Sequence, residues 1–163
     1  YEETIAKEED PQKFVLESAL AKINHASVIK KDEIVIAADT IVYFENEIIG
    51  KPKTMPEAFQ FLKRMSGECH SVYTGMAVKD GASGEVFTAA EETKVYFAKF
   101  SDTEIETYLD RIDPLDKAGA YAIQGEGALI VERIEGCYYN VMGLPLVALR
   151  KLLIKIGVDL LTA

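Results

Sequence analysis

Apolar and polar residues recur with two different periods along this chain, and each change of period marks a new element. After Pro11, apolar residues return at helical spacing, which predicts a helix over residues 11–29. A β-branched run at 34–38 is typical of a strand covered on both faces, and a turn at 46–47 leads into a partner strand that ends at Gly50. The start of the sequence therefore predicts a helix followed by a pair of strands.

Two capping boxes mark further helices, because their side chains accept backbone N–H groups that the first helical turn leaves free. They are Thr54-x-x-Glu57 and Ser101-x-x-Glu104. Between them, alternating side chains and a glycine turn predict a hairpin over 71–98. The remaining elements are expected as strands at Ala128–Val131 and Tyr138–Met142 and as a last helix from Pro145. This order predicts an α/β domain with a mixed sheet.

Composition narrows the classes of function. The chain has 163 residues, enough for one domain with a sizeable core, and the printed sequence has no apolar run near the roughly 20 residues of a membrane-spanning helix. Its net charge of −9 opposes general binding to nucleic acid polymers or anionic membranes, although a local lysine cluster can still bind a small phosphorylated ligand. Cys69 and Cys137 form no Cys-x-x-Cys pair and are expected as reduced thiols of a cytoplasmic protein.

Asp39 is the residue that folding alone explains least well. It follows the apolar run of a strand that the pattern places in the interior, and Ile41-Val42 continue the apolar pattern after it. Burying an ionised carboxylate is costly unless the group is paired, neutralised or bound to a metal. The alternative is that the strand ends at Ala38 and that Asp39 is a solvated cap. The continued apolar pattern favours a functional role for Asp39.

Two lysines are candidates for binding phosphate. Lys51 stands between Gly50, which lets the backbone turn, and Pro52, which fixes the exit direction, and a rigidly held lysine suits phosphate. Taken alone, a Gly-Lys-Pro turn is more often a solvated loop. Lys22 lies at the edge of the apolar face of the first helix. Periodicity there favours snorkelling, with the stem on the core and the ammonium group in water.

A segment rich in small residues, DKAGAYAIQG at 116–125, follows the helix that begins after Ser101. Small residues let the backbone approach a ligand or a neighbouring strand closely, and a tight turn between elements is an equal alternative. Gln124 carries both donors and an acceptor and suits recognition of a base or a ribose. His25 and His70 are lone histidines, which predicts structural or surface roles for both.

Five motifs occur in one order along the chain, and together they are specific although each alone is weak. They are Ala38-Asp39-Thr40, Gly50-Lys51-Pro52, Ser66-Gly67-x-x-His70-x-Val72-x-Thr74-Gly75, the segment 116–125, and Asn140-Val141-x-Gly143-x-Pro145. In this order and at these spacings the chain resembles the Maf family, the septum-formation-inhibitor-like pyrophosphatases, over essentially its whole length.

The resemblance implies a single Maf-like domain over residues 1–163. Its fold is expected to be related to that of the inosine triphosphate pyrophosphatases, with helices flanking an elongated mixed sheet and a cleft between two lobes. Family members begin with a strand and a Ser-x-x-Arg-Arg loop that supplies phosphate contacts, and the printed chain is expected to lack both. The resemblance also implies a homodimer.

The resemblance further implies a reaction, in which water attacks the α-phosphorus of a nucleoside triphosphate and pyrophosphate leaves. The catalytic residues it assigns are Glu2, Asp39 and Lys51. Glu2 and Asp39 are also the expected ligands of a divalent metal, Mg²⁺ or Mn²⁺. The residues expected to bind the substrate are Lys22, Thr40, Lys117 and Gln124.

The segment 116–125 also bears on the choice of substrate. It resembles the branch of the family that acts on dTTP, UTP and modified pyrimidine triphosphates. Two alternatives stay open at this point. One is a 7-methyl-GTP pyrophosphatase of the same family, and the other is a nucleotide-binding regulator of septum formation that does not turn over its ligand.

Overall fold

The sheet of the protein is a five-stranded antiparallel array in the order β2-β1-β3-β4-β5. The computed structural model describes residues 10–26 and 30–163. The strands are β1 (Ile34–Phe44), β2 (Glu47–Ile49), β3 (Cys69–Asp80), β4 (Val86–Phe97) and β5 (Val131–Glu135). The helices are α1 (Pro11–His25), α2 (Met55–Met65), α3 (Asp102–Asp110), α4 (Tyr138–Val141) and α5 (Leu146–Lys155), with 3-10 turns η1 (Pro114–Asp116), η2 (Ala118–Ala120) and η3 (Gly125–Leu129). The expected α/β class is confirmed, but every described strand pair is antiparallel, so the expectation of a mixed sheet was wrong.

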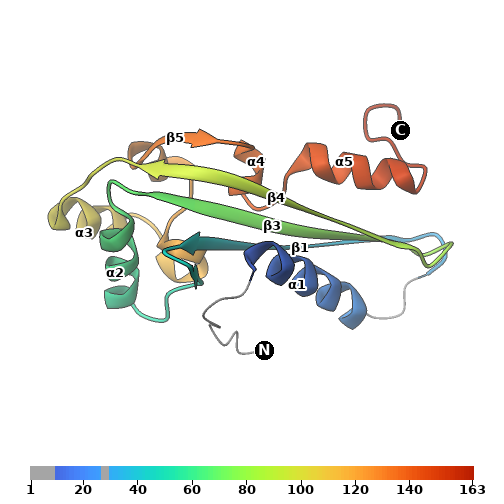
Figure 1. Cartoon of the computed structure of the whole chain (residues 1–163), viewed down its shortest axis with the longest axis horizontal. Coiled ribbons are helices and arrows are strands. Elements are labelled where there is room, and N and C mark those ends of the chain that lie inside the picture. The colour runs from blue at the N-terminus through green and yellow to red at the C-terminus, as the bar shows by residue number, and fades with distance from the viewer. Residues whose placement is uncertain (1–9, 27–29) are drawn as a thin grey trace.

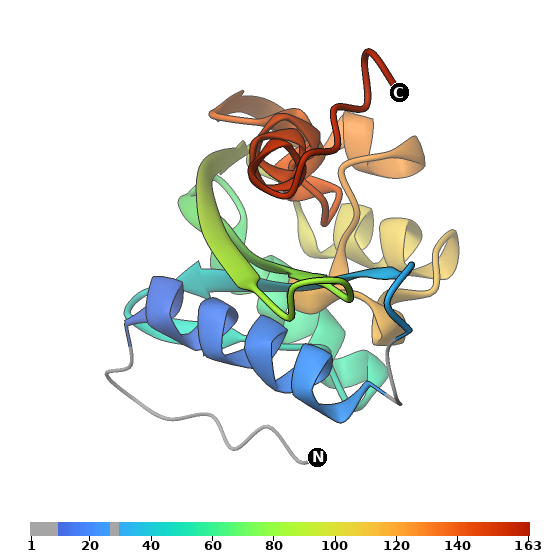
Figure 2. The same cartoon turned by 90° about the vertical axis from the view of Figure 1, so that its right-hand side faces the viewer.

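Helices α1 and α5 cover opposite faces of the long hairpin formed by β3 and β4 (Figure 1, Figure 2). The alternation of side chains along β3 explains this arrangement. Ala77 packs beneath α1 with Ala19 and Ile23, whereas its neighbours Met76 and Val78 pack against α5 on the other side. Both faces of β3 are therefore buried.

A separate and larger core lies at the other end of the sheet, where α2 and α3 pack (Figure 1). Its centre includes Leu62, Phe97 and Ile105, each at most 2% exposed. The molecule is thus elongated, with one group of helices at each end of the sheet. This agrees with the long sheet that the family resemblance implied.

Only part of the outer edge of β1 is paired in the described structure. On its inner side β1 pairs with β3 from Ile34 to Tyr43, whereas on its outer side β2 reaches only Val42 to Phe44. Ile34 and Ile36 are exposed, at 39% and 45%. The prediction of a strand covered on both faces was therefore wrong for the start of β1, because α1 covers the face that carries Val35 and Ala37, whereas Ile34 and Ile36 on the other face stay exposed.

Gly75 lets α1 lie directly on the sheet. A Cβ atom at Gly75 would overlap the backbone carbonyl of Val15 in α1. Gly75 is also the register partner of Asp39 on β1. The missing side chain therefore sets how closely α1, and with it Lys22, approaches Asp39.

We expect Gly75→Ala to lower the free energy of unfolding by about 3 kcal/mol, the upper end for an overpacked core site, because the atom it meets is backbone. Urea denaturation measures this. Gly50→Ala is the matched control, since a Cβ there meets nothing within 4 Å and the backbone angle is not positive. A loss for Gly75→Ala no larger than that of the control would contradict this account of the helix contact.

Two predicted strands proved wrong. In the segment expected as a strand at 128–131, the first two residues belong to the turn η3 and β5 begins only at Val131. Gly127 explains the turn, because its backbone lies against the carbonyl of Ala122 where no side chain fits. The second segment, 138–142, contains the helix α4.

Helix α4 replaces the expected strand because its side chains, rather than its backbone, bind the sheet. Asn140 is 0% exposed and donates from Nδ2 to the carbonyls of Val72 at 3.1 Å and Glu91 at 3.4 Å, and to Thr93 Oγ1 at 2.9 Å. The tyrosines and valine of the segment favour a strand, and this tertiary contact overrides that preference.

The predicted helices are close to those observed. Helix α1 ends at His25, short of the expected residue 29, and residues 27–29 lie outside the described part. The capping box at Ser101 is confirmed, whereas at Thr54 only half of the box forms, because the Glu57 carboxylate accepts from the N–H of Lys53. Within residues 10–26 and 30–163, no helix combines the length and the apolar character needed to cross a membrane.

Candidate active site

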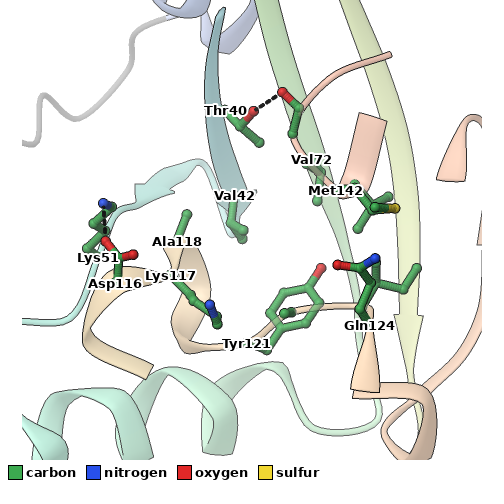
Figure 3. A pocket seen from close by; sticks show the side chains of 14 residues that line it. Thr40, Val42, Lys51, Val72, Asp116, Lys117, Ala118, Tyr121, Gln124 and Met142 are labelled. Atoms are coloured by element: carbon green, nitrogen blue, oxygen red, sulfur yellow. Dashed lines mark hydrogen bonds and ion pairs between the residues drawn. The ribbon is translucent and has the colours of Figure 1, made fainter. Parts of the chain in front are cut away.

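A cavity of about 330 Å³ opens beside β1 and β3 (Figure 3). Its walls come from β1, β3, the loop after β2, the segment from η1 to the start of η3, and the end of α4. The residues expected from the sequence that line it are Thr40, Lys51, Lys117 and Gln124. The apolar part of its lining includes Val42, Val72, Ile123, Val141 and Met142. The cavity thus has an apolar wall and a rim that carries two lysines.

Lys51 is held at the rim by an ion pair. Its Nζ lies 2.7 Å from Oδ1 of Asp116, and both side chains are exposed (Figure 3). The hydrogen bond from Lys51 holds the pKa of the Asp116 carboxyl below its usual range, with a further contribution from the nearby charge of Lys117. An exposed ion pair of this kind contributes at most about 1 kcal/mol. A ligand with several negative charges can therefore displace Asp116 and bind Lys51 in its place.

The segment 116–125 is folded back against the lysine loop. The N–H of Gly119 donates to the carbonyl of Gly50 at 3.1 Å, next to Lys51. Gly119 and Ala120 both have left-handed backbone angles, with φ of 68° and 63°. A glycine suits this conformation, and Ala120 adopts it at a cost. The tight turn brings Lys117 and Gln124 to the same cavity.

A buried chain of hydroxyl and amide groups fixes the opposite wall. The hydroxyl oxygens of Thr40 and Thr74 lie 2.8 Å apart, and Thr40 also donates to the carbonyl of Gly143 at 3.4 Å. Thr74 donates to the carbonyl of Asn140 at 3.3 Å. Because Asn140 anchors α4, this chain sets the position of Met142 and Gly143 in the cavity wall.

Asp39 lies on the other face of β1, beside α1. Its side chain is only 13% exposed, and Oδ1 accepts a hydrogen bond from Lys22, whose Nζ also donates to the carbonyl of Ala38 at 2.8 Å. Its second oxygen, Oδ2, is buried and has no hydrogen-bond partner in residues 10–26 and 30–163. Lys22 is half exposed, as snorkelling predicts, but its ammonium group binds Asp39 rather than water alone.

The site has two halves, the cavity on one face of β1 and the Asp39–Lys22 pair on the other, and they meet at the open edge of this strand. Successive residues of a strand point to opposite faces, so Asp39 faces α1 and Thr40 faces the cavity. No strand in the described residues covers the outer edge of β1 at these positions. A ligand that crosses this edge can therefore contact the cavity on one side and Asp39 on the other. Asp39 and Lys22 do not line the cavity itself.

Within residues 10–26 and 30–163, no group of three or more His, Cys, Asp or Glu side chains is gathered in a way that would hold a metal ion. Glu2, one of the two expected ligands, lies outside the described residues. The unpartnered Oδ2 of Asp39 suits a divalent cation, because a hard cation such as Mg²⁺ commonly takes one or two carboxylates and completes its shell with water and substrate phosphate.

Sequence reasoning missed four residues that build the site. Asp116 pairs with Lys51, Asn140 anchors α4, Tyr121 lines the cavity, and His70 contacts the Tyr121 hydroxyl from behind. All four belong to the ordered motifs, so their positions were marked. The contacts of these residues could not be predicted, because a motif gives no distances between segments that are far apart in the sequence.

His70 is buried and neutral, as a structural histidine should be. It is 2% exposed, and burial lowers its pKa from 6.5 to about 4. The unfolded chain therefore binds a proton near pH 6.5, whereas the folded chain resists protonation until about pH 4. Stability from this group is present above pH 6.5 and is lost as the pH falls through this window.

We expect the wild-type protein to lose about 2 kcal/mol more stability than His70→Gln between pH 7.5 and pH 5, because only the wild type carries this titrating ring. Urea unfolding at the two pH values measures the difference. His25→Gln, which removes an exposed ring, serves as the matched control. Equal pH dependence in His70→Gln and the wild type would contradict the neutral, buried histidine.

The fold is an α/β domain, and the cavity with its two rim lysines is suited to a small phosphorylated ligand. Residues 1–156 match the family described as Maf-like protein. The chain belongs to this family, as the order of the five motifs predicted.

Curated relatives that cover most of the chain share one name. A dTTP/UTP pyrophosphatase from Caldicellulosiruptor bescii is 45% identical over 160 residues, which are 98% of this chain and 80% of that protein. One from Dictyoglomus turgidum is 44% identical over 160 residues, covering 98% and 83%. One from Caldanaerobacter subterraneus subsp. tengcongensis is 48% identical over 152 residues, covering 93% and 73%.

Proposed function

We propose that this protein hydrolyses dTTP and UTP to the nucleoside monophosphate and pyrophosphate. The observation that carries the proposal is the cavity with an apolar wall and two rim lysines, Lys51 and Lys117, next to a buried carboxylate, Asp39, with one free oxygen. A nucleotide has the matching parts, a flat base at one end and a chain of phosphates at the other. The names of the relatives support the choice of dTTP and UTP.

The cavity lining carries a local excess of positive charge, although the chain as a whole is acidic. The net charge of the chain is −9, yet two lysines, Lys51 and Lys117, line the cavity against one carboxylate, Asp116. Lysine ammonium groups bind phosphate as point charges. The apolar wall is suited to a pyrimidine ring, and the amide of Gln124 can pair with its polar edge, since it offers two donors and an acceptor. Thr40 adds a hydroxyl on the opposite wall.

A divalent cation, Mg²⁺ or Mn²⁺, fits this arrangement. Asp39 Oδ2 would be one ligand, and Glu2 is the second ligand that the family resemblance implies. Bound there, the cation would neutralise phosphate charge and make a water molecule easier to deprotonate. Lys22 keeps the other oxygen, Oδ1, engaged and leaves Oδ2 without a partner among the described residues.

Each residue of the site has its own role in the proposed reaction. Asp39 orients the attacking water and accepts its proton. Lys51 and Lys22 stabilise the charge that develops on the phosphates and on the departing pyrophosphate, because fixed positive groups gain most where charge builds up. Gln124 and Thr40 hold the nucleoside so that the α-phosphorus lies at the edge of β1, next to Asp39. This positioning contributes to the rate by itself.

We expect removal of divalent cations with EDTA to abolish pyrophosphate release, and added Mg²⁺ or Mn²⁺ to restore it. A coupled assay for pyrophosphate follows both steps. The heat-unfolding curve should change little, since Lys22 already pairs with Asp39 in the absence of a cation. Full turnover in EDTA would remove the metal from the mechanism.

A panel of triphosphates tests the function itself. We expect pyrophosphate release from dTTP and UTP and much slower release from 7-methyl-GTP and the ordinary purine triphosphates. Preference for 7-methyl-GTP would move the protein to the other branch of the family. Tight binding of nucleotide with no release from any substrate would instead favour a regulator of septum formation. The expected homodimer and the expected cytoplasmic location both stay predictions. Sedimentation analysis of the purified protein tests whether it is a homodimer.

A further inference from the structure

Two side chains at the back of the cavity, His70 and Tyr121, have no part in the mechanism above. The Nε2 atom of His70 lies 2.7 Å from the hydroxyl oxygen of Tyr121. His70 is 2% exposed and Tyr121 is 6% exposed, and Tyr121 lines the cavity. Figure 3 shows the Tyr121 hydroxyl directed toward the space that the amide of Gln124 also faces.

Both rings are locked by their packing. Phe97 meets the His70 ring and the Tyr121 ring edge-on, with centroids 4.7 Å apart in each pair. Such edge-to-face pairs are favourable for aromatic rings. The three rings form one cluster, so neither polar group can turn to find another partner. The direction of the hydrogen bond between His70 and Tyr121 then decides what the hydroxyl can offer to a ligand.

Burial decides this direction. The His70 ring is neutral at pH 7, because burial lowers its pKa to about 4, and a neutral imidazole carries one N–H. Its Nδ1 atom is buried and has no partner among the described residues. An N–H at Nδ1 would be a buried donor without an acceptor, which is rare in proteins. With the N–H at Nε2, His70 donates to the Tyr121 oxygen, and the Tyr121 hydrogen is free to point into the cavity.

We propose that Tyr121 contacts the bound nucleotide and that His70 is its positioning residue. His70 donates from Nε2 to the Tyr121 oxygen, and the Tyr121 hydroxyl then donates to an oxygen of the pyrimidine nucleotide. This inference rests on the proposed function for its ligand. It adds a polar contact to the wall opposite Thr40 and explains why a polar pair is retained beside Phe97.

Nitrogen NMR of the imidazole rings tests the direction of the bond without any ligand. The chain has two histidines, so His70 is resolved from the exposed His25, which is an internal control. We expect the His70 proton at Nε2 and a bare Nδ1 at pH 7, and we expect Tyr121→Phe to shift the His70 signals but not those of His25. A proton at Nδ1 would overturn the proposal, because Tyr121 would then donate to His70.

Titration with dTMP tests the contact with the ligand and needs no turnover. We expect Tyr121→Phe and His70→Phe each to weaken dTMP binding about fivefold to tenfold, the loss of one neutral hydrogen bond. The double variant should bind no worse than either single one, since both remove the same contact. His70→Gln, which keeps a donor, should recover most of the affinity. Thermal unfolding shows whether each variant is folded.

Tyr108→Phe is the matched control. The Tyr108 hydroxyl accepts a hydrogen bond from the N–H of Ala122 at 3.3 Å, so it supports the same segment without lining the cavity. Equal losses for Tyr121→Phe and Tyr108→Phe would reduce Tyr121 to a structural anchor and overturn the inference. If the wild type binds dTMP and cleaves dTTP but Tyr121→Phe binds equally well, only the inference fails. If the wild type neither binds dTMP nor cleaves dTTP, the proposed function fails, and the proposed contact between Tyr121 and the nucleotide fails with it.

Discussion

Asp39→Asn should lower the turnover of dTTP by about 10²–10³-fold while the protein stays folded, because this is the usual effect of removing one group that acts in the transition state. Asparagine has the same shape as aspartate, but it has no negative charge to hold a cation or to accept a proton from water. The Asp39 side chain is 13% exposed and has one oxygen without a partner, so the variant removes the feature that folding alone leaves unexplained. Steady-state release of pyrophosphate measures the loss.

A matched variant separates this effect from the loss of an ion pair. Asp102 pairs with Lys63 at 2.8 Å on the surface of α3, away from the cavity. Asp102→Asn therefore makes the same chemical change to an exposed pair and should leave turnover within about twofold of the wild type, since such pairs contribute little. Near-normal turnover in Asp39→Asn would remove Asp39 from the mechanism.

Lys51→Gln should be the second most damaging change, with a loss of turnover of about 10²-fold. Lys51 lines the cavity, and among the described residues its ammonium group pairs with the exposed Asp116 alone. Glutamine keeps a polar chain of similar length but cannot neutralise phosphate. Because the extra charge on the departing pyrophosphate builds up only as its bond to the α-phosphorus breaks, the loss should appear mainly in kcat.

Two further variants give this result its controls. Lys63→Gln removes an exposed and paired lysine that is remote from the cavity, and it should leave kcat unchanged. Asp116→Asn frees Lys51 from its partner and should lower KM for dTTP by a few-fold, since the substrate no longer competes with a carboxylate. A kcat for Lys51→Gln equal to that of Lys63→Gln would contradict a catalytic role for Lys51.

Asp39 shows how much of the site the sequence predicts. Its place in an apolar strand was sufficient to mark it as costly to bury, and the structure places it where this cost is met by Lys22. The role of Lys22 could not be read from periodicity, because the contact joins a helix and a strand. The contact between Lys22 and Asp39 depends on Gly75, because Gly75 lets the α1 backbone lie directly on β3.

The segment after η2 shows where sequence reasoning about the fold ends. Apolar runs at 128–131 and 138–142 favoured strands, but the structure has η3 and α4 there. In the first case a glycine contact bends the backbone, and in the second the buried Asn140 side chain binds the sheet. Both causes are contacts between distant segments, which no local pattern contains. Helices with clear caps, such as the one after Ser101, were predicted closely.

The pairing of strands in the antiparallel sheet could likewise be predicted only in part from the sequence. The hairpin of β3 and β4 was evident from alternation and a glycine turn, and β1 with β2 from the turn before β2. The pairing of β1 with β3, across the whole of α2, was not evident, because nothing local specifies which strands become neighbours. This pairing places Asp39 beside Gly75 and Thr40 beside Thr74, and so it builds both halves of the site.

In the proposed reaction, water attacks the α-phosphorus of a pyrimidine triphosphate bound at the edge of β1. Turnover of dTTP in water enriched in oxygen-18, with the products weighed by mass spectrometry, shows which phosphorus atom the water attacks. We expect dTMP that carries one heavy oxygen and pyrophosphate that carries none. Formation of dTDP and inorganic phosphate, or heavy oxygen in the pyrophosphate, would contradict it.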